Sequence, residues 1–297
     1  MATRVAVVTG GNRGIGLEIC RQLASNGVLV VLTARDEEKG SQAVEDLQRS
    51  GLSDVIFHRL DVADRSSITQ LAEFVKAKFG KLDILVNNAG IAGTTIDPER
   101  LKELQLQNPE EDLRTFVDAY MGSLKQHYEL AKECVEVNFH GTKDVTDCLI
   151  PLLLLSNSGR VVNVSSKVAQ LKYMSNEGVI GVLSDIDSLS EEKLNEVKDE
   201  FLADFKDGNL AARGWLPVVS AYAASKALVN AHSRLLARRH PSLVMCCVTP
   251  SFVRTGMNYG MGLVSAEEGA RAPVSLALRD DPADSGLNFD IFDVCDF

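Results

Sequence analysis

A cluster of glycines near the start of the chain constrains its fold more than any other feature. The motif spans Gly10 to Gly16 and reads GGNRGIG. The apolar run Val5 to Thr9 precedes it, as a strand would, and apolar residues recur at helical spacing from Ile15 to Leu23. Glycines let the backbone approach a ligand, and the unpaired N–H groups that open a helix bind anions. The pattern predicts a cradle for dinucleotide phosphates, formed by Gly10, Asn12, Arg13, Gly14, Ile15 and Gly16.

Strand and helix patterns alternate along the rest of the chain. Apolar runs typical of buried strands occur at Val28–Thr33, Val55–Leu60, Ile84–Asn87, Arg160–Val164 and Val244–Val248. Helical patterns occur between them at Glu37–Arg49, Ser66–Phe79, Cys134–Leu149 and Tyr222–Arg239. This alternation predicts an α/β fold with a doubly wound parallel sheet, formed by one domain over residues 1–297.

Two segments interrupt the alternation. Residues 92–125 are polar and acidic, and residues 173–216 contain a helical pattern from Leu194 to Phe205 behind the N-cap residue Ser190. Connections of this length in a compact domain are usually lids or binding loops. Surface decoration is the alternative interpretation.

Charge and composition argue against several classes of partner. The formal net charge is -10, whereas nucleic acids and anionic membranes bind clustered Lys and Arg. The longest apolar runs, such as Leu152–Leu155, fall far below the ~20 residues of a membrane span. The residues from Met1 to Val8 lack the pattern of a signal peptide, so we expect a cytoplasmic protein. The six cysteines contain no C-x-x-C pair, which favours reduced thiols and no metal site.

The end of the second expected strand bears on the choice of dinucleotide. Asp36 could accept the ribose hydroxyls of NAD. Arg35 beside it and Arg13 in the glycine motif could instead clamp the 2′-phosphate of NADP. We favour NADP(H), with Asp36 as the N-cap of the next helix. Further contacts are expected at the carboxyl ends of the third and fourth strands, from Asp61, Val62, Asn88, Ala89 and Gly90. An ordinary turn also accounts for Asp61-Val62.

A tyrosine and a lysine four residues apart form the candidate catalytic pair. Tyr222 and Lys226 share one face of a helix, and a nearby ammonium lowers the pKa of a phenol. Such a tyrosine can protonate a carbonyl oxygen as hydride reaches the carbon. Ser165 and Ser166 end the fifth strand, where a hydroxyl can stabilise negative charge on that oxygen. No Gly-x-Ser-x-Gly motif is present, which disfavours a hydrolase.

The motifs TGGNRGIG, NNAG, NVSS and YAASK, in this order and spacing, resemble the short-chain dehydrogenase/reductase family over nearly the whole chain. The resemblance implies a Rossmann-type sheet of seven parallel strands. It also implies a catalytic tetrad of Asn138, Ser166, Tyr222 and Lys226, in which Ser166 is preferred to Ser165. Asn138 would hold a water that links Lys226 to solvent. Tyr222 and Lys226 would contact the cofactor as well.

Finer features resemble one branch of that family. The segment TARD at 33–36 and the two long insertions resemble carbonyl-reductase-type members. The segments LIPLL at 149–153, KYMSNE at 172–177 and MNYG at 257–260 are most similar to those of the plant salutaridine reductase and menthone/neomenthol reductase group. This resemblance implies an NADPH-dependent ketone reductase. It also implies a monomer, because an extra helix would cover the face through which relatives form tetramers.

One residue departs from the family pattern. Pro250 is followed by Ser251 where the family has glycine, and a β-carbon at that turn restricts positive φ. Pro250, Val253 and Thr255 remain expected cofactor contacts in the matching P-x-x-V-x-T frame.

The hypothesis is therefore reduction of an apolar terpenoid or alkaloid-type ketone, with Tyr222 as the acid. An alcohol dehydrogenase working in the oxidative direction and a non-catalytic NADP-binding regulator are the alternatives. The loops could bring seven side chains around the ketone, namely Val168, Leu171, Tyr173, Met174, Trp215, Met257 and Tyr259. Plain packing explains any one of them equally well.

Overall fold

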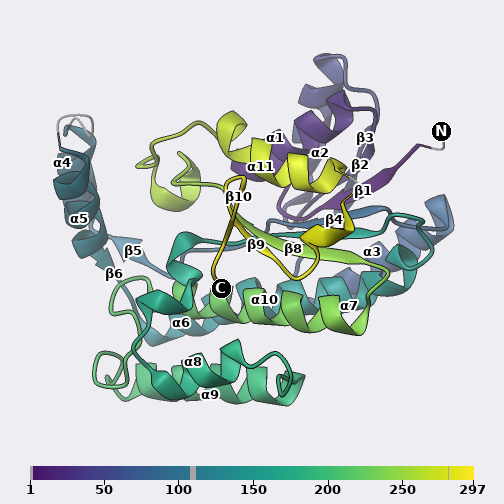
Figure 1. The fold of residues 1–297 in the computed structure, drawn as a ribbon. Helices are drawn as coiled ribbons and strands as arrows, with labels where there is room; N and C mark the ends of the chain where they lie inside the picture. The colour runs from purple at the N-terminus through teal and green to yellow at the C-terminus, as the bar shows by residue number, and fades with distance from the viewer. Residues whose placement is uncertain (1–2, 108–111, 280) are drawn as a thin grey trace.

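One sheet of eight strands organises the fold. The structure is a computed structural model and describes residues 3–107, 112–279 and 281–297. The strand order is β10-β9-β8-β7-β4-β1-β2-β3 (Figure 1). Seven strands pair in parallel, and β10 pairs antiparallel with β9 at one edge. The strands are β1 Val5–Val8, β2 Leu29–Ala34, β3 Val55–Arg59, β4 Ile84–Asn87, β7 Arg160–Val164, β8 Val244–Thr249, β9 Asn288–Asp290 and β10 Asp293–Cys295. The predicted doubly wound parallel sheet is confirmed, with one antiparallel strand added.

Helices cover both faces of this sheet. One face carries α1 Gly14–Ser25, α2 Glu37–Arg49 and α11 Ala266–Leu278. The other face carries α3 Arg65–Phe79, α7 Thr142–Leu153 and α10 Ser220–Arg239. The strand order reverses between β1 and β4, and ligands of open α/β sheets bind at such a point, beyond the carboxyl ends of the strands.

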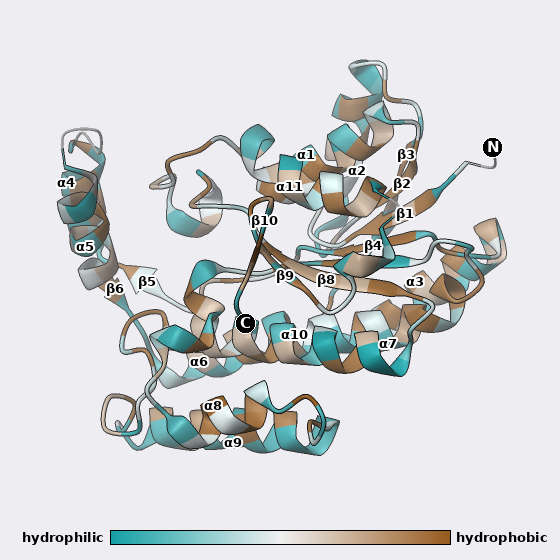
Figure 2. Ribbon diagram, in the orientation of Figure 1, coloured by the Kyte–Doolittle hydropathy of each residue, from teal (hydrophilic) through white to brown (hydrophobic). Residues whose placement is uncertain are grey.

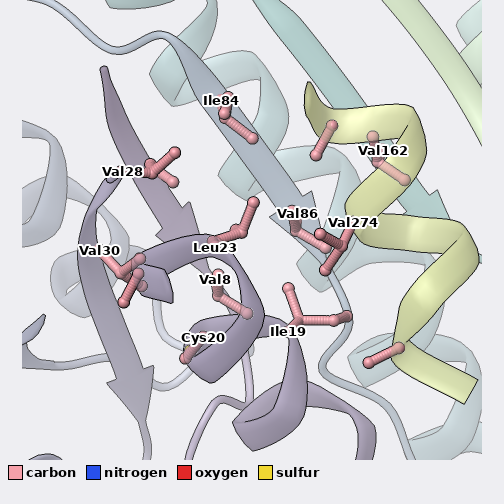
Figure 3. Packing of buried hydrophobic residues seen from close by; sticks show 14 of the residues in the cluster. Val8, Ile19, Cys20, Leu23, Val28, Val30, Ile84, Val86, Val162 and Val274 are labelled. Atoms are coloured by element: carbon pink, nitrogen blue, oxygen red, sulfur yellow. The ribbon is translucent and has the colours of Figure 1, made fainter. Parts of the chain in front are cut away.

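The continuous apolar strands follow from this two-sided burial. In β1, Ala6 and Val8 face the cluster beneath α1 and α11, whereas Val5 and Val7 face the cluster beneath α3 and α7. Figure 3 shows Val8 among residues of α1, β2, β4 and α11. Figure 2 shows the sheet mostly in brown and the outer helices in alternating brown and teal, as amphipathic helices require.

The helix expected at Cys134–Leu149 is longer than predicted and is interrupted. It consists of α6 Tyr128–Val135, a π-helical turn at Glu136–Gly141, and α7. A β-carbon at Gly141 would lie 2.8 Å from Cγ2 of Val62, so the chain passes closer there than a larger residue allows. Single π-helical turns are frequent at functional sites, and this one contains Asn138.

The two insertions form separate helical layers. The first contains β5 Thr95–Ile96, α4 Pro98–Gln105, α5 Leu113–Ser123 and β6 Leu124–Lys125, while its residues 108–111 lie outside the described part. Figure 1 shows α4 and α5 standing apart from the sheet as an arm. The second contains α8 Glu177–Ser184 and α9 Glu191–Lys206, which pack with α6 and α10. Ser190 accepts a hydrogen bond from Lys193 N at 3.3 Å and is the predicted N-cap of α9.

In the described ranges, no helix has both the length and the apolar character needed to cross a membrane.

Candidate active site

The glycine motif forms a tight turn between β1 and α1. Gly10 and Gly14 adopt φ values of 64° and 56°, which favour glycine. A β-carbon at Gly16 would lie 2.3 Å from the carbonyl oxygen of Gly10 and 2.4 Å from Nδ2 of Asn88. Arg13, the N-cap residue of α1, makes no capping hydrogen bond with its side chain, and the first turn contains no acidic residue. The motif therefore has the shape and the N–H donors of a phosphate cradle.

Asn88 fastens this cradle to β4. Its Nδ2 donates to the carbonyl oxygens of Thr9 at 2.9 Å and Gly10 at 3.1 Å. The hydroxyl of Thr9 accepts hydrogen bonds from the N–H groups of Asn88 and Ala89, both at 2.9 Å. Sequence reasoning missed Thr9, although its place between an apolar strand and the glycines is a usable signal. The side chain of Asn88 thus shapes the loop itself.

The residues that bear on cofactor choice differ in whether they have partners within the protein. Asp36 caps α2 by accepting a hydrogen bond from Lys39 N at 3.0 Å, and its carboxylate lies 2.9 Å from Nζ of Lys39. The hydrogen bonds from Lys39 hold the pKa of Asp36 below its usual value. Arg13 and Arg35 are exposed, and neither forms an ion pair with a residue in the described ranges. Two guanidiniums are therefore available to a phosphate, while the carboxylate already has a partner.

Asp61 and Val62 have structural partners of their own. The carboxylate of Asp61 accepts a hydrogen bond from Ala63 N at 3.0 Å, and Asp61 N donates to Ser67 Oγ at 2.9 Å. Val62 lies against Gly141 in the π-helical turn. The local bonds fit the turn interpretation that the sequence left open for these two residues.

Lys226 is buried beneath the mouth of the site. Its side chain lies on α10, is 4% exposed, and donates from Nζ to the carbonyl oxygen of Val164 at 2.7 Å. The Nζ atom lies 5.9 Å from the centroid of the Tyr222 ring, one helical turn earlier. A β-carbon at Gly90 would lie 3.6 Å from Lys226 Nζ, which brings the segment after β4 to the same place.

The pKa values of this pair depart from the expectation. Burial raises the pKa of Tyr222 to about 12, aided by the nearby Cys134, and a hydrogen bond with Ser166 only partly opposes it. Burial lowers the pKa of Lys226 to about 8. The predicted lowering of the tyrosine pKa was therefore wrong for these surroundings, because desolvation of the phenolate is the largest cause and only Ser166 opposes it.

The two serines after β7 have different environments. Ser165 is buried and donates to Oδ1 of Asn230 at 2.6 Å, so its hydroxyl is committed to α10. Ser166 is half-buried, and its hydroxyl lies close enough to the Tyr222 phenol to oppose the rise in the pKa of that phenol. The structure therefore brings Ser166, and not Ser165, together with Tyr222.

Asn138 is joined to the segment after β4. Its Nδ2 donates to Ile91 O at 2.9 Å and to Ser225 Oγ at 3.1 Å, and its Oδ1 accepts from Ile91 N at 2.8 Å. The hydroxyl of Ser225 in turn donates to Tyr222 O at 2.8 Å. The π-helical turn is thus connected to the Tyr222 helix. Both hydrogens of the Asn138 side-chain amide therefore have acceptors within the protein.

The segment after β8 reaches the glycine motif. A β-carbon at Gly14 would lie 3.4 Å from Cγ2 of Thr255, and one at Gly256 would lie 3.7 Å from a terminal guanidinium nitrogen of Arg13. Val253 is buried and pairs with Val264 in an isolated bridge. Ser251, which stands where the family has glycine, adopts a φ of 74°. The turn therefore keeps the left-handed backbone despite the β-carbon.

The residues expected around a ketone have mixed positions. Trp215 is buried, donates to Asp204 at 2.8 Å and packs edge-on against Phe201, so it is a packing residue of the second insertion. Leu171 and Met174 are buried in the same cluster, and Val168 is half-buried beside them in sequence. Tyr173 and Met257 are 41% and 37% exposed, and Tyr259 packs beside the arm.

These features define a class of protein. A phosphate cradle, a buried lysine, a tyrosine and a serine meet at the carboxyl edge of a parallel sheet, as in dinucleotide-dependent oxidoreductases. Residues 4–177 match the family model described as short chain dehydrogenase. The chain belongs to the short-chain dehydrogenase family.

Comparison with known proteins supports this membership over nearly the full length. The chain is 47% identical to salutaridine reductase of Papaver somniferum over 300 residues, which cover 99% of this chain and 96% of that protein. The solved structure of salutaridine reductase from Papaver somniferum superposes with a TM-score of 0.91 and 48% identity, covering 97% of this chain and 99% of that one.

Two other relatives extend the comparison. (+)-Neomenthol dehydrogenase of Arabidopsis thaliana is 50% identical over 278 residues, which cover 93% of this chain and 91% of that protein. Carbonyl reductase (NADPH) 1 of Bos taurus is 38% identical over 288 residues, which cover 92% of this chain and 90% of that protein. The relatives thus include reductases and a dehydrogenase of small molecules.

Proposed function

We propose that this protein reduces a ketone on an apolar terpenoid or alkaloid-type molecule to a secondary alcohol, with NADPH as cofactor. The observation that carries the proposal is the meeting of Tyr222, Ser166 and Lys226 beside the glycine motif. The names of salutaridine reductase and neomenthol dehydrogenase support the substrate class, and the bovine carbonyl reductase supports NADPH.

The residues present fit this cofactor. The glycine turn Gly10 to Gly16 would hold the pyrophosphate, because a β-carbon at Gly16 would fill the cradle. Arg13 and Arg35 would bind the 2′-phosphate, since Asp36 is occupied as a helix cap. Asp61, Val62, Asn88, Ala89, Gly90, Pro250, Val253 and Thr255 would line the remainder. When bound, NADPH supplies a hydride to the carbonyl carbon.

The protein residues manage the proton and the charge on the oxygen. Tyr222 keeps its proton at neutral pH because its pKa is about 12, so the phenol can donate to the carbonyl oxygen as that oxygen gains charge. Ser166 would donate a second hydrogen bond to the same oxygen. Lys226, whose pKa is about 8, would return a proton toward Tyr222 and bind the nicotinamide ribose. Asn138 would fix the position of the Tyr222 helix through Ser225.

The same pKa values bear on the alternatives. Oxidation of an alcohol needs Tyr222 as a phenolate, and burial disfavours that form, so at neutral pH the phenol is in the protonated state that reduction uses. A cofactor-binding regulator would not need a serine hydroxyl beside the phenol. We also propose that the protein is a monomer, because α8 and α9 lie over the outer side of α6 and α10.

The proposal is tested with purified protein, NADPH and a panel of terpenoid, alkaloid and steroid ketones, by following loss of NADPH absorbance. Tyr222→Phe should lower kcat by roughly 10² to 10⁴ while the Kd for NADPH stays within about threefold of wild type. Tight NADPH binding without turnover on any ketone would support the regulator instead. Equal rates for the wild type and Tyr222→Phe would remove Tyr222 from its role.

A further inference from the structure

The segment that follows Ser166 has little structure of its own. It consists of two short 3₁₀ turns, Lys167–Ala169 and Leu171–Tyr173, which connect β7 to the second insertion. Such turns are poorly stabilised by their own hydrogen bonds. The segment contains Val168 and Tyr173, which are half-buried and exposed respectively and which border the place proposed for the ketone. Something outside the segment must therefore fix its position.

The chain from β9 to Phe297 supplies the missing contacts. Nζ of Lys167 lies 3.1 Å from Oδ2 of Asp290 at the end of β9. Nε2 of Gln170 donates to Asp296 O at 3.3 Å, and Leu171 N donates to Phe297 O at 3.3 Å. Three residues of the Ser166 segment are thus bound to one stretch of chain, which begins at the last residue of β9 and ends at Phe297. This stretch also lines a small cavity behind Ser165 and Ser166.

Phe297 is itself anchored on the Tyr222 helix. Its ring lies 4.5 Å from the guanidinium carbon of Arg234, and its side chain packs against the apolar cluster of α6, α8, α9 and α10. Arg234 also donates to Leu183 O at 3.2 Å, so the guanidinium is held in place from α8. Figure 1 shows the chain descending from β10 to α10, where the C mark lies. Stacking of a ring on a fixed guanidinium orders the backbone of Phe297, which holds Leu171.

We propose that Phe297 is a positioning residue, which holds the segment after Ser166 against the Tyr222 helix and so sets the distance between Ser166 and the ketone. The inference rests on the proposed reductase function for its effect on catalysis. Its effect on the segment itself does not depend on any reaction. Small displacements of groups that orient a substrate lower the reaction rate by large factors. Loss of the Phe297 contacts should therefore lower the rate measurably.

The test compares two phenylalanines of the same hairpin region. Phe297→Ala removes the ring from Arg234, whereas Phe292→Ala removes a ring that is 53% exposed and makes none of these contacts. Phe297→Ala should lower kcat/KM for the ketone by about tenfold and leave the Kd for NADPH unchanged. Phe292→Ala should match the wild type in both. Phe297→Tyr keeps an aromatic ring over Arg234 and should restore the rate.

Amide hydrogen exchange gives a readout that needs no substrate. In Phe297→Ala the amide of Leu171 should exchange at least about fivefold faster than in the wild type, and in Phe292→Ala it should not. Phe297→Leu is measured in parallel. If the alanine variant folds poorly, the leucine variant still tests the inference. If the wild type reduces no ketone, the proposed function fails, and the exchange rates still decide the role of Phe297. Unchanged exchange at Leu171 in both Phe297 variants would overturn the inference, as would equal kcat/KM in Phe297→Ala and Phe292→Ala.

Discussion

The side-chain amide of Asn138 is hydrogen-bonded in both directions to the backbone of Ile91, as donor at 2.9 Å and as acceptor at 2.8 Å. Ile91 follows β4, whereas Asn138 lies in the π-helical turn between α6 and α7. The pair therefore joins the sheet edge that bears Gly90 to the helices that face Tyr222.

Replacement of this amide should weaken the fold measurably. Asn138→Ala leaves the part-buried N–H and C=O groups of Ile91 without their partners and empties a buried site, so we expect the free energy of unfolding to fall by about 2–4 kcal/mol. Urea denaturation followed by circular dichroism measures this change. Ser225→Ala is the matched control, because it keeps the Ile91 pair and should cost only about 1 kcal/mol. A smaller loss for Asn138→Ala than for Ser225→Ala would show that the Ile91 pair is unimportant.

The lowered pKa of Lys226 predicts a limb in the pH profile of ketone reduction. Because burial lowers this pKa to about 8, the side chain is an ammonium below that pH and a neutral amine above it. If the ammonium supplies the proton that Tyr222 loses, kcat/KM should fall about tenfold per pH unit above about pH 8. Steady-state rates measured from roughly pH 6 to 10 would show the limb.

Lys226→Arg identifies the group responsible for this limb. A guanidinium stays protonated throughout the range, so the variant should be less active but its profile should not descend near pH 8. Persistence of the same descending limb in Lys226→Arg would assign it to another group. Tyr222 is not a candidate, because its pKa of about 12 lies above the range.

The glycine cradle should tolerate no side chain at Gly16. A methyl group there would overlap the carbonyl oxygen of Gly10, which belongs to the glycine turn that we propose as the phosphate site. We expect Gly16→Ala to raise the Kd for NADPH by at least about tenfold, because the cradle must open to make room. Fluorescence titration with NADPH measures the Kd. Gly27→Ala is the control, because Gly27 has a φ of 75° but a β-carbon there would have no atom within 4 Å. This variant should lower the free energy of unfolding by about 1 kcal/mol and leave the Kd for NADPH unchanged.

Much of this site could be predicted because its signals are local. The strand, glycine turn and helix at 5–25 are contiguous, and the spacing of Tyr222 and Lys226 places them on one helical face. The ends at Ile84, Asn87, Arg160 and Val164 agree with the structure, since buried parallel strands are continuous apolar runs. Asp36 was also predicted as a helix cap, and that prediction needed only the residues next to it in the sequence.

The features that sequence reasoning missed depend on distant partners. The π-helical turn around Asn138 is stabilised by Ile91, which lies 47 residues earlier, and no local pattern records that contact. The pKa of Tyr222 depends on burial, so the spacing to Lys226 alone gave the wrong direction. Strands β9 and β10 have three residues each and were not assigned, because short strands at a sheet edge lack a periodic signal.

The departure of Ser251 from the family pattern is visible in the sequence, and in the structure its backbone is strained. Replacement of Ser251 by glycine should therefore stabilise the protein. Its φ of 74° is held from both sides, because Ile291 N donates to Thr249 O at 2.9 Å and Leu263 N donates to Phe252 O at 2.7 Å. A β-carbon in the left-handed region costs about 1–2 kcal/mol, and glycine avoids that cost while losing some entropy on folding. We therefore expect Ser251→Gly to raise the free energy of unfolding by about 1 kcal/mol, measured by urea denaturation. Ser251→Ala keeps the β-carbon and removes only the hydroxyl of an exposed residue, so it should remain within about 0.5 kcal/mol of the wild type. A glycine variant no more stable than the alanine variant would mean that the turn relaxes and that the β-carbon imposes no strain.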